Sequence, residues 1–280
     1  MSKPINGTQL KAAFKKWDVD AEYLSGFETR GRPASLGWGD VKGIVIHHTA
    51  DETQSESYVN WLFKTGRADL PAPLCHFATN KKGKTYVGAL GRANHAGKGS
   101  ASVLDLVKSE KYDGFNKELK GGNSKDGNAV FYGNEVMYRG VNGFHMTNEQ
   151  YQGVLKFCAA LCDFHGWSAL SIIGHREWAS TKIDPGYVDM AKLRRDVQKL
   201  LDSKDSAPAP VEVDSPTTLK VQTYYVNKDV VNGYDKPNGK SKKQRSRNFK
   251  LYTVAYKIVN GETWVRHPAG LWYREAGLRK

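Results

Sequence analysis

The chain has 280 residues, 39 % of them hydrophobic and 25 % charged, the composition of a soluble globular protein with room for one large domain and one small one. No apolar stretch could span a bilayer, and the first residues, MSKPINGTQLKAAFKKW, lack the apolar core of a signal peptide. We therefore exclude a membrane protein and expect one that stays in the cytoplasm, at least at first.

The formal net charge of +13 is concentrated at the C-terminal end. Residues 217–280 contain 14 Lys and Arg against 4 Asp and Glu. An anionic polymer is therefore a plausible partner of this part of the chain. The three cysteines, Cys75, Cys158 and Cys162, are too few and too scattered for a disulfide framework. Cys158 and Cys162 are four apart in a helical pattern, so we expect them to pack in the core rather than to have a metal or redox role.

The first elements in chain order are a short helix, a strand and a second helix. The helix is expected at Gln9 to Trp17, and the continuous apolar run Gly43 to His47 predicts a strand in the interior of a sheet. Thr53 and Glu56 have the spacing of a capping box, and we predict that this second helix ends at Gly66.

The middle of the chain alternates between strand signals and loop signals. Two short runs, Cys75 to Thr79 and Thr85 to Val87, are separated by a turn sequence and predict a hairpin. Residues 91–128 are rich in Gly, Ser, Asn and Lys, and we expect a substrate-facing loop there. Strand character returns at 128–138.

Two further helices complete this region. The first has a capping box at Thr147 and Gln150 and a stop at Gly166, and the second spans Asp189 to Leu201. An apolar run that predicts a buried strand, Leu170 to Ile173, lies between them. Strands alternating with helices predict an α/β domain with a mixed sheet flanked by helices, over residues 1–203 with a lead-in at 1–40.

A second domain is predicted after residue 203. Residues 204–216 are polar and rich in proline, which is typical of a linker. Short β-type runs separated by Asn-Gly turns then fill residues 217–280 and predict a small all-β barrel.

The stretch GHREWASTKIDPG, residues 174–186, concentrates groups that could do chemistry. His175 follows a predicted strand and Asp184 lies on the loop behind it, while His47 ends another predicted strand. Two imidazoles and one carboxylate suit a zinc ion, which in catalytic sites keeps a fourth position open for water. A single histidine at a strand end is more often structural, so this hypothesis depends on the combination.

These stretches also carry a family resemblance. IVIHHTA at 44–50 and GHREW…KIDPG resemble the zinc N-acetylmuramoyl-L-alanine amidases, a fold shared by phage lysozyme-type amidases and animal peptidoglycan recognition proteins. The similarity runs from about residue 29 to about 200. It implies an enzyme that acts on bacterial peptidoglycan, with Zn²⁺ bound by His47, His175 and Asp184.

The resemblance also implies roles for two charged residues. Glu135 stands where the family's cytoplasmic, muropeptide-processing branch has its general base, and Lys182 would stabilise the oxyanion of the tetrahedral intermediate. Other branches use a tyrosine in a Tyr-His-Phe motif, where this chain has Cys75. That departure favours Glu135 as the base. A buried structural carboxylate and a solvated surface lysine remain the alternatives.

Substrate contacts are expected at His95, which resembles the histidine of the family's WHAG-type segment, and at Trp178. Residues 217–280 loosely resemble bacterial SH3-like modules, and we expect wall binding by Trp264, Trp272 and Tyr273. Aromatic rings among basic residues could also bind nucleic acid, although a wall polymer suits a peptidoglycan enzyme better.

The leading hypothesis is a phage endolysin that hydrolyses the amide bond between N-acetylmuramic acid and L-alanine. Such a protein would wait in the host bacterial cytoplasm until release and then act on the cell wall. A cytoplasmic muropeptide-recycling amidase is the second enzyme hypothesis. A peptidoglycan-binding protein on the same fold, without catalysis, is the third.

Overall fold

The computed structural model describes residues 2–114, 122–205, 222–226, 230–234, 240–247, 250–253, 255–259, 262–266 and 271–279. Contacts divide the chain into two compact units, Met1–Ser206 and Ala207–Lys280, and each is described by itself. The predicted linker at 204–216 lies outside the described residues except for its first two positions. Within the described part, no helix has both the length and the apolar character needed to cross a bilayer.

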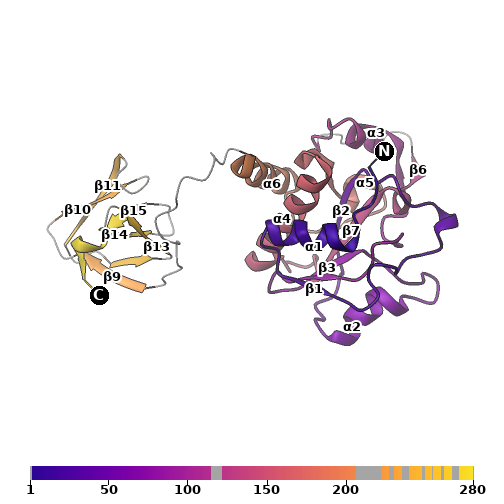
Figure 1. Ribbon diagram of the computed structural model, residues 1–280, viewed down its shortest axis with the longest axis horizontal. Coiled ribbons are helices and arrows are strands. Elements are labelled where there is room, and N and C mark those ends of the chain that lie inside the picture. Colours follow the sequence, from indigo (N-terminus) through magenta and orange to yellow (C-terminus); the bar gives the residue numbers. More distant parts are fainter. Residues whose placement is uncertain are drawn as a thin grey trace. The chain divides into compact units, whose positions relative to one another are not determined.

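A six-stranded mixed sheet forms the centre of the first unit (Figure 1), with the strand order β1-β4-β3-β7-β2-β8. Its strands are β1 (Ala21–Tyr23), β2 (Gly43–His48), β3 (Phe77–Thr79), β4 (Thr85–Val87), β7 (Phe131–Val136) and β8 (Ile172–Gly174). Only the β3–β4 pair is antiparallel, and it is the predicted hairpin. The predicted α/β fold with a mixed sheet flanked by helices is confirmed.

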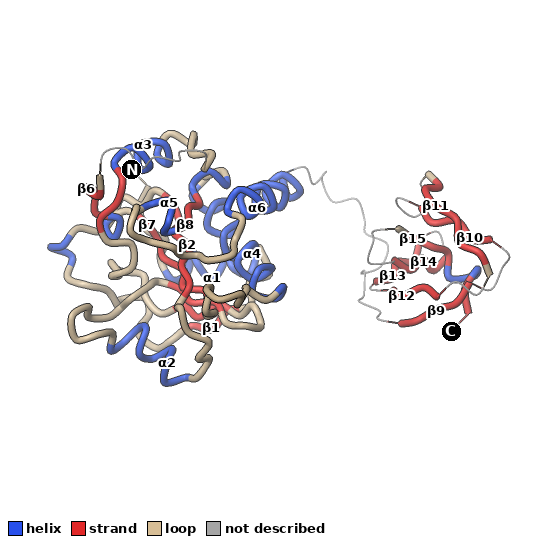
Figure 2. The backbone as a smooth tube through the Cα atoms, turned by 180° about the vertical axis from the view of Figure 1, so that it is seen from behind, coloured by secondary structure: helices blue, strands red, loops and turns tan. Residues whose placement is uncertain are grey.

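Helices cover the sheet on both faces (Figure 2). They are α1 (Gly7–Lys16), α2 (Glu56–Asn60), α3 (Ala101–Lys108), α4 (Asn148–His165), α5 (His175–Trp178) and α6 (Met190–Asp205). The longest, α4, begins with the predicted capping box of Thr147 and Gln150 and ends at Gly166, whose φ of +67° is the left-handed value expected of a helix stop. Both α1 and α6 contact α4.

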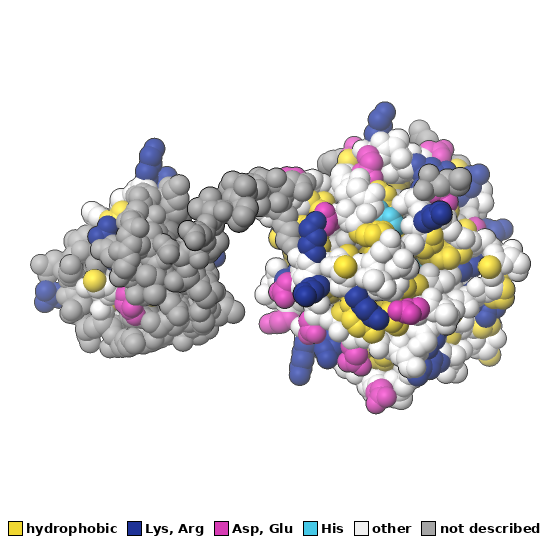
Figure 3. All heavy atoms as spheres, viewed as in Figure 1, with side chains coloured by type: hydrophobic (Ala, Val, Ile, Leu, Met, Phe, Trp, Pro, Cys, Tyr) yellow, Lys and Arg dark blue, Asp and Glu magenta, His cyan; other side chains and the backbone are white. Residues whose placement is uncertain are grey.

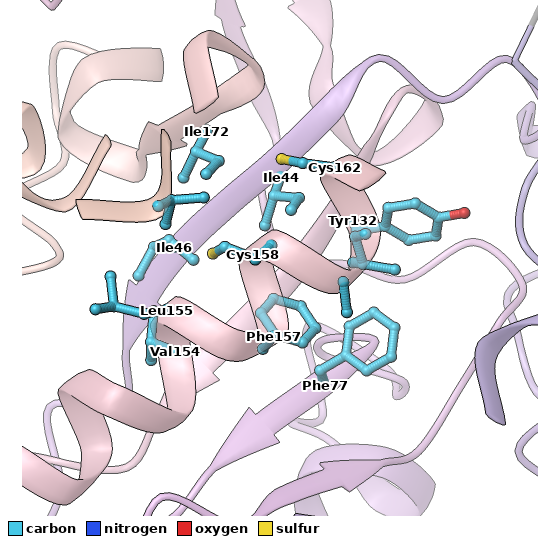
Figure 4. Packing of buried hydrophobic residues seen from close by; sticks show 14 of the residues in the cluster. Ile44, Ile46, Phe77, Tyr132, Val154, Leu155, Phe157, Cys158, Cys162 and Ile172 are labelled. Atoms are coloured by element: carbon cyan, nitrogen blue, oxygen red, sulfur yellow. The ribbon is translucent and has the colours of Figure 1, made fainter. Parts of the chain in front are cut away.

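The larger core lies between α4 and one face of the sheet (Figure 4). Alternate residues of β2 point to opposite faces, so Ile44 and Ile46 face α4 together. Cys158 and Cys162 are free thiols, fully buried in this layer. The prediction that they pack in the core is therefore confirmed.

The other face of the sheet carries a smaller core and, beyond it, the polar site. Val45 packs there with Ile173 and Trp178, and all three side chains are fully buried. His47 lies two residues beyond Val45 on the same strand, so it points to the same face of the sheet.

Two local predictions are wrong. The helix that contains α2 is capped by Ser55, whose side chain accepts the Tyr58 N–H, while Thr53 instead hydrogen-bonds Asp51. Residues 91–128 are not a continuous loop, because they include β5 (Lys98–Ser100), α3 and β6 (Asn123–Asp126). The α3 helix is held by its buried apolar face and by the cap at Ser100.

The described part of the second unit consists of β-strands and one short 3₁₀ helix, Glu275–Gly277. Its strands are β9 (Gln222–Val226), β10 (Val230–Tyr234), β11 (Ser241–Ser246), β12 (Lys250–Thr253), β13 (Ala255–Val259), β14 (Glu262–Arg266), β15 (Trp272–Arg274) and β16 (Leu278–Arg279). They form one sheet in the order β11-β10-β15-β14-β13 and another in the order β12-β9-β16. The most basic stretch of the chain forms β11, a strand that the sequence did not indicate.

Charged side chains of both signs lie on the surface of the first unit. Figure 3 shows basic and acidic side chains interspersed over the visible face of the first unit, without a field of one sign. This agrees with the concentration of the net positive charge in residues 217–280.

Candidate active site

The site lies at the carboxyl ends of three neighbouring parallel strands. His47 is near the end of β2, Glu135 is opposite it in register on β7, and His175 directly follows β8. Asp184 comes from the loop after α5. The sheet topology therefore brings together four residues that are far apart in the sequence.

Three of these side chains form a tight triangle. His47 Nδ1, His175 Nδ1 and Asp184 Oδ2 each lie 3.0 Å from the other two atoms. His47 is 1 % exposed, His175 4 % and Asp184 9 %. Burial, followed by the neighbouring His175, lowers the pKa of His47 to about 4, so this imidazole is neutral at neutral pH.

The hydrogen bonds on the outer side of the triangle determine where the protons lie. His175 Nε2 is 3.1 Å from the Ala96 carbonyl oxygen and His95 Nε2 is 3.0 Å from that of Phe131, so both nitrogens donate. Because burial keeps the pKa of His95 well below its usual range, its Nδ1 is bare and accepts the His47 Nε2–H over 3.0 Å. Because Nε2 is the donor in both rings, Nδ1 is the nitrogen of His47 and of His175 that is left to present a lone pair toward Asp184.

This donor set fits a zinc ion. Three acceptor atoms converge without a proton of their own, which is favourable only when a cation lies between them. A tetrahedral zinc ion with nitrogen and oxygen ligands at about 2.0–2.1 Å separates its ligands by about 3.3 Å, so the triangle needs to open only slightly. The residues are the ones predicted from the sequence, and they are able to hold a metal.

Buried ion pairing fixes the segment that carries His175. Glu177 accepts the Gly174 N–H and forms a two-pronged ion pair with Arg194 of α6, at 2.9 and 3.0 Å. Arg176, the residue before Glu177, donates side-chain hydrogen bonds to the carbonyls of Pro185 and Val188. The part of the loop that follows Asp184 is therefore tied to α5.

Glu135 lies beside the triangle; the residue is half-buried, and its carboxyl oxygen Oε2 is fully buried. Its Oε2 has no hydrogen-bond partner among the described residues. Burial, followed by the negative charge of Asp184, raises the pKa of Glu135 to about 8, against a smaller opposite effect of Lys182. A carboxyl group with a pKa near neutrality can both accept and return a proton.

A cavity of about 440 Å³ opens over these residues. Its other wall comes from α2 and the helical turn that follows it, Trp61–Thr65, and there Tyr58 and Trp61 stack at 5.5 Å. Lys182 is exposed, lines the same cavity, and has no ion-pair partner within the described residues. The cavity thus combines a polar floor with an aromatic wall.

Several predicted contacts need correction or remain open. Trp178 is fully buried against Gly99 and Gly127, so it is a core residue that cannot touch a substrate. His95 lines the cavity, but both of its ring nitrogens are already hydrogen-bonded.

In the second unit, Trp264 and Tyr273 are also fully buried, which corrects the prediction that they bind the wall, whereas Trp272 is half-buried. Tyr273 packs in a small core with Leu251 and Val265, and Trp264 packs edge-to-face against Tyr234 at 5.3 Å.

Sequence reasoning missed the aromatic wall. Tyr58 and Trp61 lie within the second predicted helix, and nothing in their spacing tells which face of that helix meets a cavity. A helical turn with wider, π-type geometry starts at Trp61, a feature that is common at functional sites and invisible in a sequence.

The chain is similar to one protein family and to several solved structures. The family model described as N-acetylmuramoyl-L-alanine amidase (Amidase_2) matches residues 37–187, while no curated protein matches the chain. Similar solved structures include the endolysin amidase LysCS from Clostridium intestinale, with 17 % identity and a TM-score of 0.42 over 63 % of this chain and 94 % of that one. Another is an AmpD derivative, with 20 % identity and a TM-score of 0.44 over 63 % and 94 %.

A third is Staphylococcus aureus AmiA in complex with its ligand, with 14 % identity and a TM-score of 0.40 over 74 % of this chain and 98 % of that one. The family match covers both motifs and more than half of the chain. The chain therefore belongs to the N-acetylmuramoyl-L-alanine amidase family and is an enzyme that cleaves bacterial peptidoglycan.

Proposed function

We propose that this amidase is a zinc enzyme with His47, His175 and Asp184 as its metal ligands. The observation that carries the proposal is the buried triangle of three acceptor atoms, each 3.0 Å from the others. When bound, zinc would polarise the carbonyl of the scissile amide and lower the pKa of a water molecule.

Glu135 would act as the general base and then as the general acid. Its side chain lines the cavity beside His47, and its raised pKa lets it take a proton from the attacking water and pass it to the leaving nitrogen. Its unpartnered Oε2 supports this role, because a structural carboxylate at this depth would be hydrogen-bonded.

Lys182 would stabilise the oxyanion of the tetrahedral intermediate. It lies two residues before Asp184 and faces the same cavity, and its charge acts on both Glu135 and His47. A cation placed where negative charge develops stabilises the transition state of amide hydrolysis more than it stabilises the bound substrate, and so lowers the activation barrier. Because Lys182 is exposed, its side chain can also adjust its position to a bound substrate.

The whole chain is proposed to be a phage endolysin, with a catalytic domain at 1–203 and an SH3-like wall-binding domain at 217–280. The strongly basic second unit supports this assignment, because soluble muropeptides need no wall anchor whereas an anionic wall polymer would bind it. Lys242 and Lys243 are exposed on β11, and Trp272 is the remaining aromatic candidate for a wall contact.

Deletion of residues 217–280 tests the modular proposal. The full chain and the truncated chain are compared on insoluble peptidoglycan and on soluble muropeptides. We expect both proteins to cleave the soluble substrate equally, and the truncated one to lose wall binding and to digest the wall more slowly. Equal wall binding by the two proteins would instead favour the muropeptide-recycling amidase.

A further inference from the structure

A segment of three residues, 95–97, contacts both histidines of the triangle from outside. The His95 ring accepts a hydrogen bond from His47 Nε2 over 3.0 Å, and the Ala96 carbonyl accepts one from His175 Nε2 over 3.1 Å. These two contacts decide which nitrogen of each histidine keeps its proton and therefore which one is free to bind a metal. The position of residues 95–97 is thus part of the metal site.

One side chain holds this segment in place. The Oδ1 atom of Asn128 accepts the N–H groups of His95, Ala96 and Gly97, at 2.9, 2.7 and 3.1 Å. Successive N–H groups can surround a single oxygen in this way when the last residue is left-handed, and Gly97 has a φ of +57°. The amide oxygen therefore fills a small backbone nest.

Asn128 is itself anchored away from the cavity. It is 9 % exposed, and its N–H donates to Asp126 Oδ1 over 3.0 Å. The other oxygen of Asp126 pairs with buried Arg92, which also binds the Gly37 carbonyl. The nest is therefore connected to the body of the domain through side chains that touch neither the metal ligands nor the substrate cavity.

We propose that Asn128 is a positioning residue of the metal site, acting through residues 95–97 on both His47 and His175. This inference rests on the proposed zinc site and adds a residue to it that touches neither metal nor substrate. Without the Asn128 oxygen, the three N–H groups of residues 95–97 lose their acceptor. Water does not readily replace it, because Ala96 in the middle of the segment is only 1 % exposed. The segment must then move to find new partners, and it takes the two outer hydrogen bonds with it.

The test measures zinc affinity of the full-length chain by competition with a chromogenic chelator. Loss of an outer hydrogen-bond partner typically weakens metal binding about 10–100-fold, so we expect this loss for Asn128→Ala. Asn128→Asp keeps an acceptor in the nest, and we expect an affinity within about threefold of the wild type or tighter, since the substitution restores the same hydrogen bonds.

Asn80→Ala is the matched control. Asn80 Oδ1 also accepts two backbone N–H groups, those of Lys82 and Lys84, but in the β3–β4 turn away from the triangle. We expect this variant to lose stability and to keep the zinc affinity of the wild type. If Asn128→Ala binds zinc as tightly as Asn80→Ala, the inference is overturned while the zinc site stands.

A second variant covers the case in which Asn128→Ala does not fold. His95→Phe keeps a ring in the same place and removes both the acceptor for His47 Nε2–H and the donor to the Phe131 carbonyl, so about a tenfold loss of zinc affinity is expected. Unchanged affinity in this variant would overturn the role of the segment. Failure of the wild type to bind zinc at all would overturn the proposed metal site, and the inference with it.

Discussion

Acidification should destabilise the catalytic unit through His76, by an amount that the structure lets us work out. The ring is fully buried, stacks on Trp38 at 4.8 Å and accepts the Gly133 N–H at Nδ1 over 3.0 Å. Burial, above all, lowers the pKa of His76 to about 3. In the unfolded chain His76 has an ordinary pKa near 6.5, so between about pH 6.5 and pH 3 it is protonated in the unfolded chain and neutral in the folded chain.

The sign and size follow from this difference. Stability contributed by neutral His76 is complete above about pH 6.5 and is lost as the pH falls from there toward 3. At pH 5, about 1.5 units below the pKa of the unfolded chain, protonation of His76 in the unfolded state lowers the free energy of unfolding by about 2 kcal/mol, at 1.36 kcal/mol per unit.

The assay is urea denaturation of the metal-free protein at pH 7 and pH 5. His76→Asn keeps an acceptor for the Gly133 N–H and removes the titrating group. We expect the variant to be less stable at pH 7 but to lose about 2 kcal/mol less than the wild type between the two pH values. Other buried histidines titrate in both proteins and cancel in the comparison. Equal losses in the two proteins would refute the reasoning.

Four further substitutions test the site and its support. Glu135→Gln should lower kcat by about 10²–10⁴-fold with zinc content unchanged, because the proton acceptor is lost. Lys182→Ala should lower kcat by about 10²–10³-fold with a smaller effect on KM, because its charge acts mainly on the oxyanion. Trp61→Ala should raise KM more than it lowers kcat, since it removes half of the aromatic wall. Gly99→Ala should destabilise the fold by about 1–3 kcal/mol in urea denaturation, because its Cβ would lie 2.0 Å from the Trp178 ring.

Controls for these substitutions lie on helices outside the cavity. Glu149→Gln at the start of α4 and Lys199→Ala on α6 make the same chemical changes away from the site. Both should keep wild-type kcat and KM on soluble muropeptides. Activity retained in Glu135→Gln or Lys182→Ala at the level of these controls would remove the residue concerned from the mechanism.

Strong local signals made the main elements predictable. The β2 strand follows from four successive apolar or small residues before its histidines, and α4 follows from its capping box and its glycine stop. The α3 helix was missed because it has only eight residues within a stretch whose overall composition is that of a loop. Local composition hides a short helix that is held mainly by its buried face.

The candidate ligands were predictable for a different reason. His47 and His175 each end an apolar run, and neighbouring parallel strands bring such ends to one edge of a sheet. Trp178 was misjudged because its burial depends on Gly99 and Gly127, two glycines that are distant in sequence and leave room for its ring. Asn128 carried no signal, because its partners are main-chain groups about thirty residues away.

The most direct test of the account is product analysis of purified peptidoglycan treated with the full chain, with and without a chelator. We expect new L-alanine amino termini and no new reducing sugars, with the activity abolished by the chelator and restored by zinc. New reducing ends would mean cleavage between sugars and would contradict the assignment of the site. Amide cleavage that survives complete removal of metal would contradict the role given to His47, His175 and Asp184.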